Sequence, residues 1–406
     1  MNQNAHEPAS LPVPTADALA ASAELIARIR DAVAAAGGWL PFDRYMELAL
    51  YTPGLGYYSG GARKFGRRAE DGSDFVTAPE LSPLFARTLA RALAQALDAS
   101  GTRQLMEFGA GTGRLAAGIL SALDALGTPL ESYTIVDLSG ELRERQRETI
   151  ETLGGPLASR VRWLDALPER FEGAIIGNEV LDAMPIQLYA RTGGVWHARG
   201  VGIDEAGALR FETRALDAPG ISLSKEDSAL LAQLDAEIDP HVDYVAEAHP
   251  AGAAFVRTVC TMLARGAAFF IDYGFPRGEY YHPQRTEGTL MCHYRHRAHG
   301  DPFLYPGLQD ITAHVEFTRI AEAGVETGAD LLGYTSQARF LMNAGITDVL
   351  SEIDPADAAQ FLPAANAVQK LLSEAEMGEL FKVIAFSRAI DGALDAFARG
   401  DRTHTL

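Results

Sequence analysis

A regular alternation of short apolar runs and longer helical patterns begins near residue 103 and constrains the fold more than any other feature of this chain. The apolar runs, which we predict to be strands, cover residues 104–108, 133–136, 160–164, 174–177 and, further along, 267–271. Helical spacing of apolar side chains follows the first two runs, at residues 115–126 and 139–153. This alternation is typical of a parallel sheet with helices on both faces. The sequence therefore predicts an α/β domain.

The loop between the first predicted strand and its helix reads Glu107-Phe-Gly109-Ala-Gly111-Thr-Gly113. Glycines let a ligand approach the backbone, and the helix that follows presents free N–H groups. The dinucleotide-binding pattern G-x-G-x-x-G has its third glycine one residue later. S-adenosylmethionine fits this loop better than NAD, because it has no pyrophosphate and Glu107 can hold its ammonium or balance its sulfonium charge. An ordinary tight turn is the alternative explanation for the glycines alone.

Acidic residues end the next two predicted strands. Asp137 follows the second strand, where a carboxylate can accept both hydroxyls of a ribose. Asp165 follows the third strand, from which a side chain can reach the edge of an adenine. Both acids also fit a structural role, because each stands where it can cap the segment that follows it. The spacing leaves these alternatives open.

The fourth predicted strand runs into Asn178-Glu179-Val-Leu-Asp182. Open α/β sheets bind their ligands at this place, where the strand order reverses. Glu179 and Asp182 are three residues apart, so a helical turn would put both carboxylates on one side. Such a pair can bind a planar guanidinium through bidentate hydrogen bonds. Solvated surface acids are the alternative, but the apolar residues around them disfavour solvation.

Two other motifs are less specific. Gly54-Leu-Gly-Tyr-Tyr58 either turns aromatic faces toward a sulfonium or forms a turn with two core tyrosines. Cysteine and histidine side chains with metal-like spacing stand at Cys292, His293, His296 and His299. No carboxylate pattern and no second cysteine pair accompanies them in the sequence, so we expect no metal site.

The composition excludes several classes of function. With 47% hydrophobic and 22% charged residues among 406, the chain is not of the disordered type. A formal net charge of −19 repels phosphate backbones, so we expect cationic partners and no nucleic acid. No stretch of the sequence approaches the roughly 18 consecutive apolar residues of a membrane span. The two cysteines and the absence of a signal-like N-terminal pattern predict a cytoplasmic protein.

Many short motifs in one order make this chain similar to a known family. They are Tyr45-Met46 with Ala49-Leu-Tyr51, Gly56-Tyr-Tyr58, Asp74-Phe-Val-Thr-Ala-Pro-Glu80, the glycine loop 107–113, 178–185, Ile271-Asp-Tyr-Gly274, Gly288-Thr-Leu290 with His296, 310–317, and Met377-Gly378 with Phe381-Lys382. Over about residues 25–390 the chain resembles the MidA-like family of S-adenosylmethionine-dependent methyltransferases. Mitochondrial members of that family are arginine methyltransferases that assist the assembly of respiratory complex I.

The resemblance implies the class I methyltransferase fold, a Rossmann-like α/β fold with a seven-stranded sheet, a helical N-terminal segment and insertions. It also implies cofactor contacts at Thr77, Pro79 and Glu80, and Asn178, after the fourth predicted strand, is a further predicted contact. The segment 65–74 is longer and more charged than the loop that the family usually has there. The predicted division is a mobile tail (1–22), a helical segment with a cofactor-capping loop (23–100), a core (101–390) with insertions at about 186–250 and 274–309, and a C-terminal tail (391–406).

The predicted activity is methyl transfer to an arginine of a partner protein, with a complex I subunit as the target that the resemblance implies. Glu179 is the expected proton acceptor, with Asn178 beside it and Asp182 or Asp272 sharing the positive charge of the guanidinium. A small-molecule O- or N-methyltransferase is the second hypothesis. A chaperone that binds the cofactor without transferring its methyl group is the third. A homodimer is an expected assembly.

Overall fold

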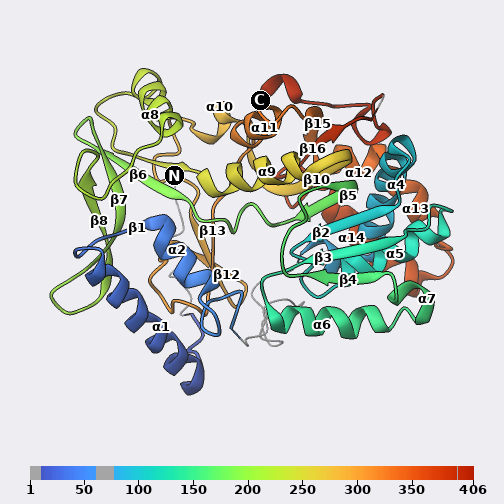
Figure 1. Ribbon diagram of the computed structural model, residues 1–406, viewed down its shortest axis with the longest axis horizontal. Coiled ribbons are helices and arrows are strands. Elements are labelled where there is room, and N and C mark those ends of the chain that lie inside the picture. The colour runs from blue at the N-terminus through green and yellow to red at the C-terminus, as the bar shows by residue number, and fades with distance from the viewer. Residues whose placement is uncertain (1–10, 61–76, 391) are drawn as a thin grey trace.

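The computed structural model describes residues 11–60, 77–390 and 392–406. Its central sheet lies in the right half of Figure 1 and has eight strands among these residues. Seven of them follow one another in the order β15 (Asp330–Ser336), β16 (Phe381–Arg388), β10 (Leu263–Phe275), β5 (Phe171–Asn178), β2 (Gln104–Phe108), β3 (Ser132–Val136) and β4 (Val161–Leu164). The strands from β10 to β4 are parallel, whereas β16 is antiparallel to both of its neighbours. The predicted parallel α/β sheet is confirmed for this part of the chain.

The eighth strand is β14 (Val315–Glu316), which pairs in parallel with the end of β10. The family resemblance implied seven strands, and β14 is the additional one. The helix α11 (Phe317–Val325) follows β14 directly. Glu316 caps this helix by accepting hydrogen bonds from the backbone N–H groups of Thr318 and Arg319.

Helices cover both faces of the central sheet (Figure 1). Neighbouring strand residues point to opposite faces, so Ile176 and Phe269 belong to one core cluster while Ile175 and Phe270 belong to another. The helices of the first cluster are α4 (Pro83–Ser100), α5 (Arg114–Ala125), α12 (Gln337–Asn343), α13 (Ile346–Ser351) and α14 (Ala358–Leu372), with α6 (Gly140–Glu151) and α7 (Gly155–Ala158) beside them. The helices of the second cluster are α9 (Pro250–Met262) and α11.

The insertion at 186–250 forms a second sheet with one helix, in the left half of Figure 1. Its strands are β6 (Gln187–Thr192), β7 (Val195–Ile203), β8 (Leu209–Ala215) and β9 (Tyr244–Ala248), and its helix is α8 (Lys225–Glu237). The N-terminal segment contributes β1 (Leu40–Pro41), which pairs with β7, and the helices α1 (Ala16–Ala35) and α2 (Phe42–Tyr51). Apolar side chains of α1 and α2 share a core cluster with Ile186 and Val201. The two segments, distant in sequence, therefore form one layer.

The insertion at 274–309 contains α10 (Arg277–Tyr280) and two strands of a third sheet. That sheet joins β11 (Met291–Tyr294) to β12 (Arg297–His299) and to β13 (Asp310–Thr312). The insertion is tied to the N-terminal helices, because Ser22 Oγ donates to the carbonyl of Pro306 and Tyr45 Oη donates to the carbonyl of Pro302. This packing brings the third sheet to the C-terminal edge of the central sheet.

Both predicted tails are wrong in part. Helix α1 begins at Ala16, with Thr15 as its N-cap, so residues 16–22 are helical rather than mobile. The C-terminal segment includes two short helices, Asp395–Phe397 and Thr403–Thr405. It is packed because Leu394 and Phe397 are buried and the latter contacts Phe340. The predicted capping loop at 65–74 lies outside the described residues. No helix in the described ranges is long and apolar enough to cross a membrane.

Candidate active site

A cavity of about 360 Å³ opens at the C-terminal ends of β2, β5 and β10. The predicted site residues that line it are Thr77, Pro79, Glu80, Glu107, Gly109, Gly111, Asn178, Glu179 and Asp182. Lining residues outside that predicted set include Tyr58, Arg114, Tyr273, His293, Asp310 and His314. The glycine loop and the acidic turn, which are far apart in sequence, therefore face one space.

The glycine loop takes a backbone conformation that favours glycine. Gly109 has φ 65°, and a Cβ atom there would lie 2.8 Å from the Cγ1 atom of Val180. Gly111 has φ 53°. Helix α6 holds the loop in place, because Gln146 Nε2 donates to the carbonyl of Gly111 at 3.1 Å and Thr149 Oγ1 donates to the carbonyl of Thr112 at 2.7 Å. The loop is thus a preformed cradle rather than an ordinary turn.

The short helix α3 (Ala78–Leu81) closes one side of this cradle. Glu80 Oε1 accepts a hydrogen bond of 2.5 Å from Thr112 Oγ1, and Arg114 Nε lies 3.2 Å from Glu80 Oε2. Glu80 therefore ties α3 to the glycine loop. Arg114 was not among the predicted site residues. Its guanidinium is positively charged and can pair with the carboxylate of a ligand.

Glu107 lies at the base of the cavity and is 2% exposed. Burial raises the pKa of Glu107 to about 7, although the hydrogen bond from Tyr133 Oη at 2.7 Å opposes the rise. A cationic ligand group would stabilise the ionised form of this carboxylate. Such an acid suits an ammonium or a sulfonium better than a neutral ligand.

The acidic turn is not helical, contrary to the prediction. Glu179 has φ 54°, and its backbone N–H donates to the carbonyl of Ile271 at 2.8 Å. Asp272 holds the turn from behind, since its Oδ2 atom accepts from the backbone N–H groups of Leu181 at 2.9 Å and Asp182 at 3.3 Å. The positive φ of Glu179 departs from the helical conformation, and the bonds to Asp272 hold the turn that results. Asp272 is fully buried and is not a lining residue, so it positions the turn rather than facing a ligand.

Three carboxylates still meet in the cavity. Asp182 Oδ2 accepts from Tyr273 Oη at 2.5 Å, and Asp310 accepts from Tyr58 Oη at 3.0 and 3.1 Å. Burial and the neighbouring Asp182 raise the pKa of Glu179 to about 8. Burial raises the pKa of Asp182 to about 6. At neutral pH Glu179 is therefore mostly protonated, and a nearby cation would stabilise its ionised form.

Two buried polar atoms at the cavity have no partner among the described residues, Asn178 Oδ1 and His314 Nδ1. Asn178 Nδ2 donates to Glu179 Oε1 at 3.0 Å, which leaves the amide oxygen to accept from a ligand. Burial lowers the pKa of His314 to about 4, so its ring is neutral. The cradle, the acceptor atoms and the acids together fit S-adenosylmethionine, which carries an ammonium, a sulfonium and a carboxylate.

Three predicted cofactor residues do not line the cavity. The side chain of Asp165 is 91% exposed and pairs with Arg143. Asp137 is buried and accepts from the Ser139 backbone N–H at 2.9 Å and from Gln146 Nε2 at 2.8 Å. These contacts are close to the capping role that the sequence left open for Asp137. Gly113 is the N-cap of α5, and an added Cβ there would lie 3.0 Å from the Cα atom of Gln146. Close helix packing explains this glycine.

Neighbouring cysteine and histidine side chains at 292 and 293 face opposite sides of β11. Cys292 points into the core and His293 lines the cavity, because neighbouring strand residues face opposite sides. Within the described ranges no three histidine, cysteine or acidic side chains are grouped to hold a metal ion. Asp310 and His314 were missed as site residues, although both stand in the family-like motif 310–317.

Comparison with known proteins supports a site for S-adenosylmethionine. A family model described as "Putative S-adenosyl-L-methionine-dependent methyltransferase" matches residues 88–335. A protein of Burkholderia thailandensis, described as a "likely methyl transferase" and solved with bound S-adenosyl-homocysteine, is 72% identical, with a TM-score of 0.93 over 98% of this chain and 100% of that chain. A second structure from that organism is 69% identical, with a TM-score of 0.89 over 98% of this chain and 100% of that one.

Curated relatives are more distant. The "Protein arginine methyltransferase NDUFAF7, mitochondrial" of Danio rerio is 29% identical over 380 residues, which cover 86% of this chain and 83% of the relative. These matches confirm the predicted family and the predicted cofactor, S-adenosylmethionine. Since the family model spans more than half of the sequence and a solved relative matches nearly all of it, the chain belongs to the MidA-like family of S-adenosylmethionine-dependent methyltransferases.

Proposed function

We propose that this methyltransferase acts on an arginine side chain of a partner protein. The observation that supports this proposal is the convergence of Glu179, Asp182 and Asp310 on one cavity beside the glycine loop. Burial raises the pKa of Tyr58 well above its ordinary value, and both Asp310 and Asp182 raise it further, so both carboxylates lie near the hydroxyl group of Tyr58. The acceptor that satisfies them is a cation.

A guanidinium fits this arrangement better than a neutral acceptor. It is planar and has five N–H donors, whereas an ionised carboxylate only accepts. A neutral or anionic acceptor would leave the carboxylates desolvated and unpaired, at a cost of a few kcal/mol. The Tyr58–Asp310 and Tyr273–Asp182 hydrogen bonds hold two of these carboxylates in fixed positions.

In the proposed mechanism, bound S-adenosylmethionine supplies an electrophilic methyl group. Glu179 would orient the attacking guanidinium nitrogen and accept its proton as the new N–C bond forms and the methyl–sulfur bond breaks, with the electron pair of that bond left on sulfur. Asn178 Nδ2 holds the Oε1 atom of Glu179, which restricts the carboxylate to one orientation. Asp182 and Asp310 balance the positive charge of the acceptor. Asp272 takes no part in the chemistry but fixes the turn on which Glu179 and Asp182 stand.

The names of the curated relatives support an arginine acceptor, at 25% to 29% identity. A respiratory complex I subunit as the target, a cytoplasmic location and a homodimer stay predictions. The relatives are named as mitochondrial proteins.

The test uses labelled S-adenosylmethionine and extract of a strain from which the gene is deleted. We expect purified protein to label a protein band, with methylarginine in its digest by mass spectrometry. The Glu179→Gln variant should not label it, whereas Asp165→Asn, which changes an exposed acid outside the cavity, should act like the wild type. Label in a small molecule alone would favour the second hypothesis. Cofactor binding without any transfer would favour the chaperone.

A further inference from the structure

A second cavity, of about 220 Å³, lies between the insertion and the core. Helix α8 forms its outer side, and the end of β9, α10 and α11 form the rest. Its polar lining residues are Glu226, Asp227, Gln233, His249, Arg277, Tyr281, Glu316, Arg319 and Glu322. None of its lining residues lines the first cavity. The space is therefore separate from the proposed site of methyl transfer.

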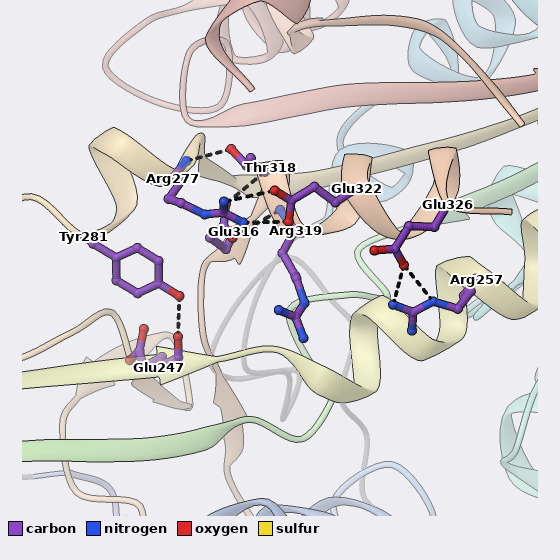
Figure 2. A network of polar contacts seen from close by, with 9 residues as sticks. All are labelled: Glu247, Arg257, Arg277, Tyr281, Glu316, Thr318, Arg319, Glu322 and Glu326. Carbon is purple, nitrogen blue, oxygen red and sulfur yellow. Dashed lines mark hydrogen bonds and ion pairs between the residues drawn. The ribbon is translucent and has the colours of Figure 1, made fainter. Parts of the chain in front are cut away.

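Most charged groups in this wall are already paired. Arg277 binds Glu322 at 2.7 Å and Glu316 at 3.4 Å, and its backbone N–H donates to Thr318 Oγ1 (Figure 2). Glu316 is also occupied as the N-cap of α11. Asp227 accepts from Tyr189 Oη at 3.3 Å. These residues build the wall and leave little free charge.

Arg319 is the exception. Figure 2 shows its side chain leaving α11 toward the junction of β9 and α9, with no contact drawn to its guanidinium. Among the described residues this half-buried guanidinium has no hydrogen bond and no ion pair. Nearby Arg257, in contrast, is paired with Glu326 at 2.9 Å. An unpaired guanidinium in a cavity offers a fork of donors that matches a carboxylate.

His249 supplies a complementary acceptor on the same wall. It is 5% exposed, and its Nε2 atom lies 3.0 Å from Tyr280 Oη. Because Tyr280 Oη donates its proton to Glu247, His249 Nε2 carries the hydrogen of that contact. Burial and the charge of Arg319 lower the pKa of His249 to about 3, so the ring is neutral. Its Nδ1 atom is then a bare acceptor, without a partner among the described residues.

Charged side chains at the edge of this cavity restrict the charge of the ligand it can bind. Glu226 is exposed on α8 and close enough to Arg319 for their charges to interact. Glu226 repels a dianion, and Arg319 repels a simple cation. A ligand with one carboxylate and one nearby ammonium satisfies all of these groups.

We propose that this cavity binds a free α-amino acid. The ligand carboxylate pairs with Arg319, and its ammonium is held by His249 and Glu226. A volume of about 220 Å³ accommodates a small organic molecule of this class. The proposal does not depend on the acceptor of methyl transfer, because the two cavities share no lining residue.

Titration calorimetry of the full chain tests the proposal. The probes are the protein amino acids other than arginine, each at millimolar concentration, with acetate and methylamine as fragments that carry one of the two charges. Arginine is left out because the first cavity is proposed to take its side chain. We expect at least one amino acid to bind, and both fragments to bind about tenfold more weakly or worse.

The matched variants are Arg319→Gln and Arg257→Gln, which change two neighbouring arginines, one unpaired and one paired with Glu326. Arg319→Gln should weaken binding by about tenfold or more, and Arg257→Gln should not. Circular dichroism checks that both variants fold. Glu226→Gln, which changes an exposed side chain, gives a second measure of amino-acid binding. No binding of any probe, binding that is equal in wild type and Arg319→Gln, or acetate that binds as well as the amino acid would each overturn the proposal.

Discussion

Removing the charge of Glu179 should make the protein more stable at high pH. The carboxyl group has an ordinary pKa of 4.5, and the fold raises the pKa to about 8. The folded state therefore binds more protons than the unfolded state between these values, so stability falls as the pH rises through them. Above pH 8 the fold carries a buried charge. The side-chain amide of the Glu179→Gln variant stays neutral at every pH.

The size of the effect follows from the same pKa values. One pKa unit corresponds to about 1.4 kcal/mol, so ionising Glu179 in the fold costs on the order of 5 kcal/mol at most. Entry of water into the cavity recovers part of this cost. We therefore expect the variant to gain a few kcal/mol over the wild type at pH 9 and almost nothing at pH 5. Glu107, whose pKa shift does not depend on Glu179, contributes equally to both proteins.

Urea unfolding at pH 5 and pH 9, without cofactor, measures this difference directly. Asp165→Asn serves as the control, because Asp165 is exposed and lies outside the cavity. Its stability relative to the wild type should change little between the two pH values. If Glu179→Gln differed from the wild type by the same amount at both pH values, the buried-charge reasoning would be wrong.

Four further outcomes are expected. Gly111→Val should weaken S-adenosylmethionine binding by about tenfold or more in calorimetry, since φ 53° strains a β-branched residue; undiminished affinity would remove the loop from the site. Glu179→Gln should lower the single-turnover rate by about 10²-fold or more while cofactor affinity stays within a few fold, and an unchanged rate would make Glu179 a structural acid. Asp310→Asn should raise the KM for an arginine peptide by roughly tenfold, with Asp165→Asn as control; an unaltered KM would argue against a cationic acceptor at this carboxylate. Deletion of residues 392–406 should lower the melting temperature by roughly 5 °C or more, because two large buried side chains are lost, and an unchanged melting curve would restore the tail interpretation.

Local sequence patterns were enough for the five parallel strands from β10 to β4 and for the glycine loop and acidic turn that face the cavity. The apolar run at 104–108 coincides with β2, and the glycine loop that follows it adopts the conformation that its glycines permit. These features are encoded locally, because strand period, helix period and turn chemistry depend on neighbouring residues. The same patterns located Glu107, Asn178 and Glu179 at the ends of their strands.

Only the tertiary structure decided which of these residues meet. Asp310 reaches the cavity because its strand β13 pairs with β11 in an insertion that is packed against the N-terminal helices. Tyr58, 252 positions earlier, donates to the same carboxylate. Asp272 fixes the turn that stands in place of the predicted helical one, by accepting from N–H groups some 90 residues away. Such contacts depend on how distant segments pack, which no local pattern encodes.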